Sequence, residues 1–466
     1  MAVTDPVTSE THRPGVPAHG PVTDRPGDSK AADRAKPLVR WGLGHALPRA
    51  AMLVAARKGD VQGRLIKVSR SGSADVLELI RELRELAPIH RGQFAYLTAS
   101  LPAVRDVLSS NDFRVGFDRA QLAGPVGRVF GWAADTGVLG PLEPPSLLVT
   151  NPPDHTRYRK LVTRVFTARA VEALRRRTQQ IADELLDDVT AAADGDVVDL
   201  VERYCTLLPV TVIAEILGVP TDERERVLAF GGAAAPSLDL GLTWKQFRST
   251  EAALAGFDTW LGEHLGRLRA EPGDDLLSQL VTAEDDGVHL DERELKATAG
   301  LVLAAGFETT VNLLGNGVAL LCEHRDQLEA LRAEPDLWPN AVDEILRYDP
   351  PVLLTGRTAL SDTEVAGTAI PRGALVTTLL AGANRDPAVF ADPDIFDVRR
   401  ANAKDHVSFS AGRHFCLGAA LARMEGDVGL RTLFDRFPDL TLAAGARRRS
   451  TRILRGYENL PVRLHG

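Results

Sequence analysis

Cysteine is scarce in this chain, because its 466 residues include only Cys205, Cys322 and Cys416. The three are far apart, and no two are separated by two residues, so the sequence predicts neither a zinc site nor a disulfide framework. This usage fits a reducing cytoplasm. Cys205 and Cys322 lie in apolar stretches, and we interpret both as packing residues.

Positive charge is also in deficit, with a net charge of −8. This argues against a nucleic-acid partner and makes any local group of basic residues more informative. Residues 1–36 lack the apolar run of a signal peptide and are rich in Pro, Gly, Thr, Ser and Asp, so we expect a disordered N-terminal tail. A hydrophobic content of 44% and a charged content of 25% are ordinary for globular proteins. We expect one domain over 37–466.

Only one stretch, 294–324, has the length of a membrane span, and it contains no proline. Glu308 lies near its centre, where an acid costs about 2.5–3.5 kcal/mol even on the lenient insertion scale. A helix buried in a large protein explains it better, so we predict no transmembrane segment. The shorter amphipathic stretch 41–57 leaves two interpretations open: contact with a membrane surface, or packing on the domain, which its length favours.

Residues 409–418 form a glycine-rich loop ahead of a stretch, 417–433, whose apolar residues have helical spacing. Cys416 is therefore predicted at or just before a helix N-terminus, where free N–H groups and the helix dipole stabilise a thiolate. Gly412 and Gly418 would let a large flat ligand lie against the backbone. A lone cysteine is usually a packing residue, but the complete loop favours a functional one.

This loop resembles the haem-ligand loop of the cytochrome P450 superfamily, Phe-x-x-Gly-x-(Arg/His)-x-Cys-x-Gly. The matching residues are Phe409, Gly412, His414, Cys416 and Gly418. The resemblance extends from about residue 80 to the C-terminus. It implies the P450 fold, mainly α with a small β region around the haem. It also implies haem b (iron protoporphyrin IX) with Cys416 as the axial ligand of the iron.

His155 and Arg159 are four residues apart behind a possible capping residue, Asp154, so they share one helical face. Alone, they would be read as a solvated surface pair. The resemblance implies that both bind the haem propionates through charge-assisted hydrogen bonds. It adds Arg357 as a further propionate ligand, and His414 as a donor beside the loop.

The same predicted helix carries four basic residues, with no acid between Asp154 and Glu172, and they form a basic face in an acidic protein. This is either an ordinary exposed face or a docking site for an acidic electron donor. Given the haem interpretation, we favour docking of a ferredoxin that is served by a separate ferredoxin reductase, since no flavin or iron–sulfur domain is recognised. The basic residues are Arg157, Lys160, Arg164 and Arg169.

The middle of the long apolar helix reads Ala-Gly-Phe-Glu-Thr-Thr over 305–310, which matches the family's oxygen-binding motif. The resemblance implies that Gly306 leaves room for O₂, Thr309 hydrogen-bonds oxygen, and Glu308 supplies protons. The alternative for Thr309 is a hydrogen bond to its own helix backbone.

Glu344 and Arg347 lie three apart on one predicted helical face. As an exposed pair they would contribute about 0–1 kcal/mol. The resemblance implies instead that they join Arg400 in a structural triad that braces the haem loop and performs no chemistry.

The substrate pocket is predicted from three segments: a long irregular stretch at 118–148, a lid at 228–247, and the stretch 352–355 after Pro351. Its candidate contacts are Phe130, Trp132, Val138, Leu139, Phe230, Leu238, Leu240, Trp244, Phe247, Leu353, Leu354 and Thr355.

Together these features predict a cytoplasmic haem-thiolate monooxygenase. It would insert one oxygen atom of O₂ into a C–H or C=C bond of a small hydrophobic substrate. A peroxide-driven haem enzyme is the nearest alternative, and a non-catalytic haem sensor or electron carrier is a more distant one. Neither alternative needs Glu308 and Thr309.

Overall fold

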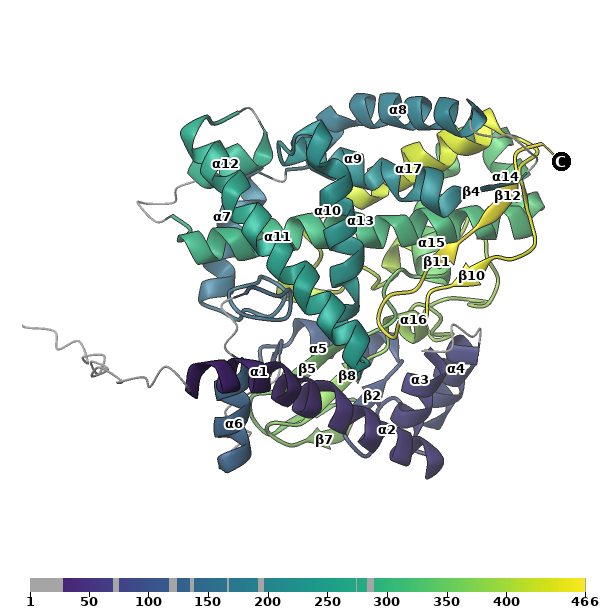
Figure 1. Cartoon of the computed structure of the whole chain (residues 1–466). Coiled ribbons are helices and arrows are strands. Elements are labelled where there is room, and N and C mark those ends of the chain that lie inside the picture. The colour runs from purple at the N-terminus through teal and green to yellow at the C-terminus, as the bar shows by residue number, and fades with distance from the viewer. Residues whose placement is uncertain are drawn as a thin grey trace, which may run out of the picture.

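The computed structural model of the chain describes residues 28–69, 75–116, 124–134, 138–165, 167–191, 197–273, 275–282 and 289–465. Helices make up most of this part, and the strands are short and lie in small sheets (Figure 1). The prediction of a mainly α fold with a small β region is confirmed.

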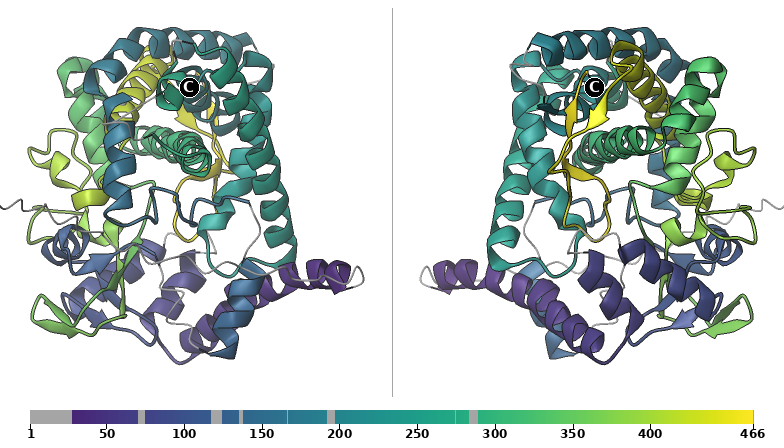
Figure 2. Two further views of the ribbon diagram at one scale, coloured as in Figure 1. Left: turned by 90° about the vertical axis from the view of Figure 1, so that its left-hand side faces the viewer. Right: turned by 90° about the vertical axis from the view of Figure 1, so that its right-hand side faces the viewer.

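The helical body is arranged around α13 (Glu292–Glu323), which Figure 2 views nearly end-on with other helices around it. The helix starts at a capping box, in which Asp291 accepts the Glu294 N–H at 2.8 Å and Glu294 accepts the Asp291 N–H at 2.9 Å. In the described part of the chain, α13 alone is long and apolar enough to span a membrane, but most of its apolar window is buried inside the protein. It is therefore a core helix, as predicted.

The helices that surround α13 form the main hydrophobic cluster with it. Close approach is needed where α17 crosses α13, because a Cβ on Gly317 would lie 2.7 Å from Leu430. The surrounding helices are α7 (Asp154–Val165), α8 (Ala168–Ala191), α9 (Leu207–Ile216), α10 (Arg224–Ala234), α11 (Trp244–Ala270), α12 (Leu276–Thr282), α14 (Arg325–Ala333), α15 (Trp338–Tyr348) and α17 (Ala419–Arg436). Short 3₁₀ or π turns join them: η3 (Val201–Cys205), η4 (Thr221–Glu223), η5 (Ala235–Leu238), η6 (Pro335–Leu337), η7 (Ala403–Asp405) and η8 (Gly412–His414).

A five-stranded sheet with the order β1-β2-β8-β5-β3 carries Arg357 on its strand β5. Only the β2–β8 pair is parallel; Arg357 pairs with Val376 across the antiparallel β5–β8 ladder. Strand β2 begins at Tyr96, directly after a turn that is closed by a hydrogen bond from the Gly92 N–H to the Ala95 carbonyl. The strands are β1 (His90–Arg91), β2 (Tyr96–Thr98), β3 (Phe113–Arg114), β5 (Thr355–Ala359) and β8 (Leu375–Thr378).

Other short elements complete the fold around this sheet and near the C-terminus. The helices beside the sheet are α3 (Val61–Ser69), α4 (Asp75–Leu86), α5 (Leu101–Ser109) and α16 (Leu380–Ala383). The remaining strands pair as β4 (Val197–Asp199), β12 (Pro461–Arg463) and β9 (Thr441–Leu442), as β10 (Arg447–Arg448) with β11 (Tyr457–Asn459), and as β6 (Thr363–Val365) with β7 (Thr368–Ile370).

The N-terminal segment departs from the prediction. Helix α1 (Asp28–Trp41), the π-helical turn η1 (Gly42–Ala46) and α2 (Leu47–Arg57) follow one another without a break, and we call them the arm. The arm includes the end of the predicted tail 1–36, and residues 1–27 lie outside the described residues. It is helical earlier than expected because it packs on other elements: Arg40, for example, donates to the Ala133 carbonyl at 2.8 Å.

Two further boundaries are corrected. The stretch 118–148 was predicted to be irregular, but it contains a helix, α6 (Pro125–Ala134), which packs beside α1. Arg169 was placed on the same helix as His155, but α7 ends at Val165 and Arg169 lies in α8.

Candidate active site

Cys416 lies three residues before the first residue of α17, as predicted. Its N–H donates to the Phe409 carbonyl at 2.9 Å, and the Phe415 N–H donates to the Gly412 carbonyl at 3.1 Å. These bonds fold the loop back on itself and leave the Cys416 side chain exposed. Arg423 of α17 stacks 4.6 Å from the centre of the Phe409 ring, which holds the start of the loop against the helix.

The two loop glycines serve different purposes. Gly412 has φ +66° and a Cβ there would lie 2.6 Å from the Leu108 carbonyl oxygen, so α5 and the loop backbone require a glycine. This corrects the expectation that Gly412 makes room for a flat ligand. A Cβ at Gly418 would meet nothing within 4 Å, so open space lies beside the thiol, as a flat ligand would need.

Desolvation raises the pKa of the Cys416 thiol, although its surface is accessible. The thiol lies in a recess surrounded by protein, so the charged form loses hydration. The Gly418 N–H, Arg159 and Arg423 act in the opposite direction but do not prevail. The Gly418 N–H thus favours the thiolate in the predicted direction, but desolvation of the sulfur has the larger effect.

Cationic and imidazole side chains from three separate elements meet beside the loop. His155 and Arg159 come from α7, Arg357 from β5, and Arg413 and His414 from η8. The rings of His155 and His414 are 4.2 Å apart, and Arg159 donates to the Phe415 carbonyl at 2.7 Å. The structure therefore brings together the propionate ligands predicted from the sequence, and Arg413 lies beside them.

Each of these basic groups makes the protonated, charged form of its neighbours less favourable. Desolvation, then Arg159 and Arg413, lowers the pKa of His155 to about 4. Desolvation, His155 and the three arginines lower the pKa of His414 to about 3. Desolvation and Arg413 lower the pKa of Arg357 to about 10.

The cluster is suited to an anionic ligand. Among the described residues, no carboxylate forms an ion pair with the cluster, and the buried His414 Nε2 has no hydrogen-bond partner. Two carboxylates placed here would relieve the repulsion and satisfy that nitrogen. The residues present thus fit the propionates of the haem implied by the resemblance, with the Cys416 thiol nearby for its iron.

Near the middle of the otherwise buried helix α13, one face is left open. Ala305 is exposed and Thr309 is half-buried, whereas Phe307 and Glu308 are buried. Residues four apart share a helical face, so Ala305 and Thr309 both lie on this open face. The Thr309 hydroxyl donates to the Ala305 carbonyl at 3.0 Å, which is the backbone bond that the alternative interpretation expected.

Gly306 does not lie on this open face. A Cβ there would lie 3.1 Å from two side-chain carbons of Ile213, so the glycine allows α9 to pack closely on α13. This corrects the prediction that Gly306 leaves room for O₂. The small residue on the open face is Ala305, which belongs to the same sequence motif but was not predicted to have this role.

Glu308 forms an ion pair with Arg449, which follows strand β10. Arg449 also donates through Nε to the Tyr457 carbonyl at 3.1 Å, so the C-terminal hairpin holds the guanidinium in place. Burial raises the pKa of Glu308, and Arg449 offsets part of this rise. Arg449 was missed because nothing in a run of three arginines, 447–449, indicates a partner far away in sequence.

A second buried carboxyl, Glu425, lies in α17 beside Thr310 of α13. Burial raises its pKa well above the ordinary value. Thr310 offsets only part of this rise, because its hydroxyl donates to the Gly306 carbonyl at 3.2 Å. The folded protein therefore keeps the Glu425 proton to a higher pH than the unfolded chain does.

This difference predicts a pH dependence of stability. The folded state binds one proton more than the unfolded state above the ordinary Glu pKa, so Glu425 should lower the unfolding free energy by about 1.4 kcal/mol per pH unit as pH rises, up to its folded pKa. Glu425→Gln removes the titration and keeps the shape. Denaturant unfolding between pH 5.5 and 8.5 should show a flatter profile for Glu425→Gln, whereas the exposed Glu329→Gln should parallel the wild type. Parallel profiles for all three proteins would contradict the assignment.

Glu344, Arg347 and Arg400 form one buried network. Arg347 contacts Glu344 through Nε at 2.6 Å and Nη2 at 2.8 Å, and Arg400 Nε lies 3.2 Å from the same carboxylate. Arg347 also donates to the Asn384 carbonyl at 2.9 Å, and the Asn384 side chain accepts the Val407 N–H at 2.8 Å. The network therefore reaches the segment that leads directly into the Cys416 loop.

The predicted docking face is partly used inside the protein. Arg157 forms a two-point ion pair with Glu294 of α13, and the Tyr158 hydroxyl donates to the same carboxylate at 2.8 Å. Arg157 is thus a link between α7 and α13, contrary to its predicted role. Lys160 and Arg164 remain exposed on α7.

The predicted pocket residues do not all reach a common space. Leu353 and Leu354 are buried in the hydrophobic cluster beside α4, and Trp132 and Trp244 are exposed next to the arm. These four are therefore not supported as substrate contacts, and the side chain of Phe130 lies outside the described residues. Half-buried candidates are Val138, Leu139, Phe230, Leu238, Leu240 and Thr355.

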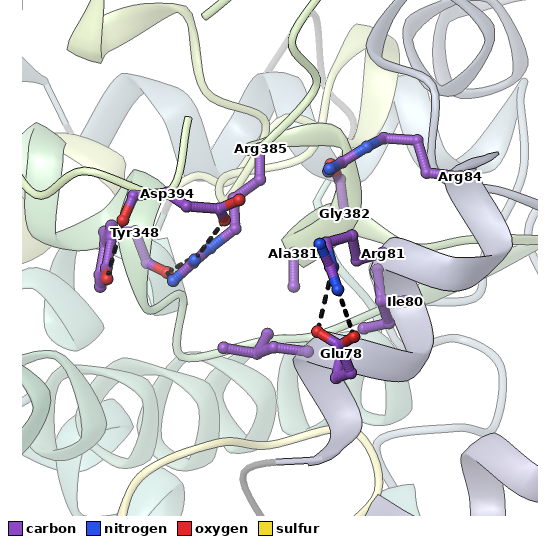
Figure 3. A pocket seen from close by; sticks show the side chains of 10 residues that line it. Glu78, Ile80, Arg81, Arg84, Tyr348, Ala381, Gly382, Arg385 and Asp394 are labelled. Carbon is purple, nitrogen blue, oxygen red and sulfur yellow. Dashed lines mark hydrogen bonds and ion pairs between the residues drawn. The ribbon is translucent and has the colours of Figure 1, made fainter. Parts of the chain in front are cut away.

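A surface pocket of about 370 Å³ lies between α4, α15 and α16 (Figure 3). Its charged groups already have partners: Arg81 pairs with Glu78, and Arg385 pairs with Asp394 at 2.8 Å and with the Tyr348 carbonyl. It contains none of the predicted site residues, so the candidate active site remains the region between the Cys416 loop and α13.

Comparison with known proteins agrees with this geometry. The Cytochrome P450 family model matches residues 238–448. Cytochrome P450 140 of Mycobacterium tuberculosis is 51% identical over 432 residues, covering 92% of this chain and 98% of that protein. The 6-deoxyerythronolide B hydroxylase of Saccharopolyspora erythraea is 42% identical over 414 residues, which cover 85% of this chain and 98% of that protein. One similar solved structure is P450BioI in complex with an acyl carrier protein that bears hexadec-9Z-enoic acid. It superposes with a TM-score of 0.74 at 30% identity, and the match covers 83% of this chain and 97% of that chain.

Proposed function

Because the chain belongs to the cytochrome P450 family and is therefore a haem-dependent monooxygenase, we propose that it inserts one oxygen atom of O₂ into a C–H or C=C bond of a small hydrophobic substrate. The observation that carries the proposal is the accessible Cys416 thiol beside a cationic cluster without carboxylate partners among the described residues. The open face of α13, with Thr309 on it, supplies the second half of the site.

The cofactor we propose is haem b. Cys416 would bind its iron, and His155, Arg159, Arg357 and His414 would bind its two propionates. When bound, the haem supplies the iron centre at which O₂ is reduced and activated for attack on carbon. Coordination would keep the Cys416 sulfur deprotonated despite the burial that raises its pKa.

Thr309 and Glu308 would move protons into the site. The Thr309 hydroxyl now donates to the Ala305 carbonyl, and a rotation about χ1 would turn it toward the open side of α13. Glu308 is buried, which favours its neutral, proton-carrying form, while Arg449 favours the charged form. Release of the Glu308 carboxyl from Arg449 would therefore raise its pKa and let it take up a proton, whereas renewed pairing with Arg449 would favour release of that proton.

The substrate would lie against the face of α13 that carries Ala305 and Thr309. Gly231 of α10, within the predicted lid 228–247, packs directly on Phe307 of α13, which is buried and lies away from this face. The name of the Saccharopolyspora relative describes a hydroxylase, which supports hydroxylation as the outcome.

We propose a ferredoxin and a ferredoxin reductase as the electron donors. An acidic donor could be attracted by the exposed Lys160, Arg164 and Arg169, and Phe415 is exposed one residue from Cys416. The free cysteines are consistent with a cytoplasmic location. We also propose that residues 37–466 form a single P450 domain, to which the first helix of the arm adds residues from Asp28.

Thr309→Ala should separate electron use from product formation. Loss of a positioned proton donor costs typically 10²–10⁴-fold, so we expect product formation to fall by about 100-fold while reductant consumption continues. The measurement is product formed per NAD(P)H consumed, with ferredoxin and reductase. The test compound is the one giving the largest ferric spin-state shift in a screen of macrolide aglycones and free fatty acids.

Thr309→Ser is the matched control, because it keeps the hydroxyl and should keep most of the coupling. Hydrogen peroxide in place of reductant tests the peroxide-driven alternative. Unchanged coupling in Thr309→Ala, or equal turnover with peroxide alone, would show that the proposed role of Thr309 is wrong.

A further inference from the structure

The arm is less buried than a packed helix of this length should be. From residue 35 to residue 58, Ala55 is the only buried residue, and Leu38 and Leu47 are 54% and 63% exposed. Leu53 and Val54 are also exposed. We propose that the arm is an interfacial helix that docks this protein on the surface of an anionic lipid bilayer.

The charge of the arm suits that partner. The arm and the following Lys58, residues 28–58, contain seven Lys or Arg residues and two acids, Asp28 and Asp33, although the chain as a whole has a net charge of −8. Of these, Arg49, Arg57 and Lys58 are exposed, and none of the three forms an ion pair within the described ranges. A basic amphipathic helix with exposed leucines has the composition of helices that lie in the headgroup region.

Two exposed tryptophans extend the same surface. Trp132 of α6 lies next to the arm, with Lys36 Nζ 5.7 Å from its ring centre. Trp244, at the start of α11, has its ring 5.6 Å from that of Trp41. Tryptophan favours the boundary between lipid and water because it has an apolar ring and a polar N–H group. Both partly exposed rings therefore lie against residues of the arm.

Contacts on the inner side fix the arm to the body. The Trp41 Nε1–H donates to the Leu242 carbonyl at 2.9 Å, and His45 Nδ1 accepts the Gly241 and Leu242 N–H groups at 3.2 and 3.3 Å. Arg40 pairs with Glu251 of α11. The outward residues are thus held outward by defined bonds, and they do not collapse onto the protein.

The shape of the arm favours a bilayer over a protein partner. Residues 28–57 are helical throughout, which corresponds to a length of about 45 Å at 1.5 Å per residue. The arm lies along the outside of the molecule (Figures 1 and 2). A flat surface can contact this whole length at once. Docking would place segment 241–251 near the lipid, and this inference does not depend on the proposed reaction.

Vesicle co-sedimentation of the full-length, haem-loaded protein tests the proposal. We expect binding to phosphatidylglycerol–phosphatidylethanolamine vesicles and much weaker binding to pure phosphatidylcholine. Each basic residue near an anionic surface contributes about fivefold, so Arg49→Glu/Arg57→Glu should weaken binding by roughly 25-fold or more. Leu47→Asn/Leu53→Asn should weaken binding to the anionic vesicles without changing its salt dependence.

Matched variants carry the same changes elsewhere on the surface. Arg372→Glu/Lys404→Glu and Leu360→Asn/Ile395→Asn alter exposed residues outside the arm and should bind vesicles as the wild type does. The carbon monoxide spectrum of every variant should match the wild type, which separates a failed docking surface from a failed haem site. Equal binding to anionic and neutral vesicles would overturn the proposal, as would an arm-dependent dimer or an acidic protein partner without vesicle binding.

Discussion

Cys416→Ala is expected to remove the thiolate ligand of the haem iron and to lower monooxygenase turnover by at least about a thousandfold, or about 4 kcal/mol of activation free energy. The change leaves the cationic cluster intact, so some haem should still bind through His155, Arg159, Arg357 and His414. The reduced protein with carbon monoxide should lose the red-shifted absorption band of a thiolate-bound haem. Haem content and product formation are measured on the same preparations.

Cys322→Ala and Cys205→Ala are the controls, because neither cysteine belongs to the site. Cys205 is buried in the main hydrophobic cluster and Cys322 is half-buried beside the Leu440 carbonyl. If Cys416→Ala kept the spectrum and turnover of the wild type, the assigned ligand would be wrong.

Arg347→Ala should cost about 3–5 kcal/mol of unfolding free energy, because it leaves Glu344 in the interior with a weaker partner. Glu344 would keep Arg400 at 3.2 Å and the Asp397 N–H at 3.0 Å. This loss is a large fraction of the total free energy of unfolding, which is roughly 5–15 kcal/mol for typical folded proteins. Denaturant unfolding of the haem-loaded protein measures it, and haem retention should decrease because the network leads into the Cys416 loop.

Arg399→Ala is the matched control, one residue from the third member of the network. Arg399 pairs with Glu334 at 2.6 Å, but both side chains are about half exposed, so the loss should stay below about 1 kcal/mol. If Arg347→Ala does not fold, Arg347→Lys keeps the charge without the two-point contact and should show an intermediate loss. Equal stability of Arg347→Ala and Arg399→Ala would mean that the buried network does not hold the loop.

Local spacing in the sequence was sufficient for several parts of the site. The position of Cys416 just before a helix and the shared face of His155 and Arg159 follow from residues a few positions apart. The central helix was predicted at 294–324 and is observed at Glu292–Glu323. The prediction was accurate because an apolar stretch of this length without proline is too long for a strand and favours a buried helix.

Predictions of which neighbouring element a residue faces were less accurate. Gly306 was assigned to the open side of α13, but it faces Ile213, and Arg157 was assigned to a docking surface, but it pairs with Glu294. Both residues lie on the elements that were predicted. Their roles depend on which neighbour packs on which face, and a single sequence does not contain that information.

The sequence by itself determined the chemistry of this protein: the thiol, the imidazole and guanidinium groups, and the acid and hydroxyl of one buried helix. Only the tertiary structure decided how they are paired. It brought Arg357 of a strand and His155 of a helix close to His414, paired Glu308 with Arg449, and left the outer face of the arm uncovered. The physical reason is that residue type and spacing fix what a side chain can do and which face it shares, whereas contacts between distant segments arise only when the whole chain packs.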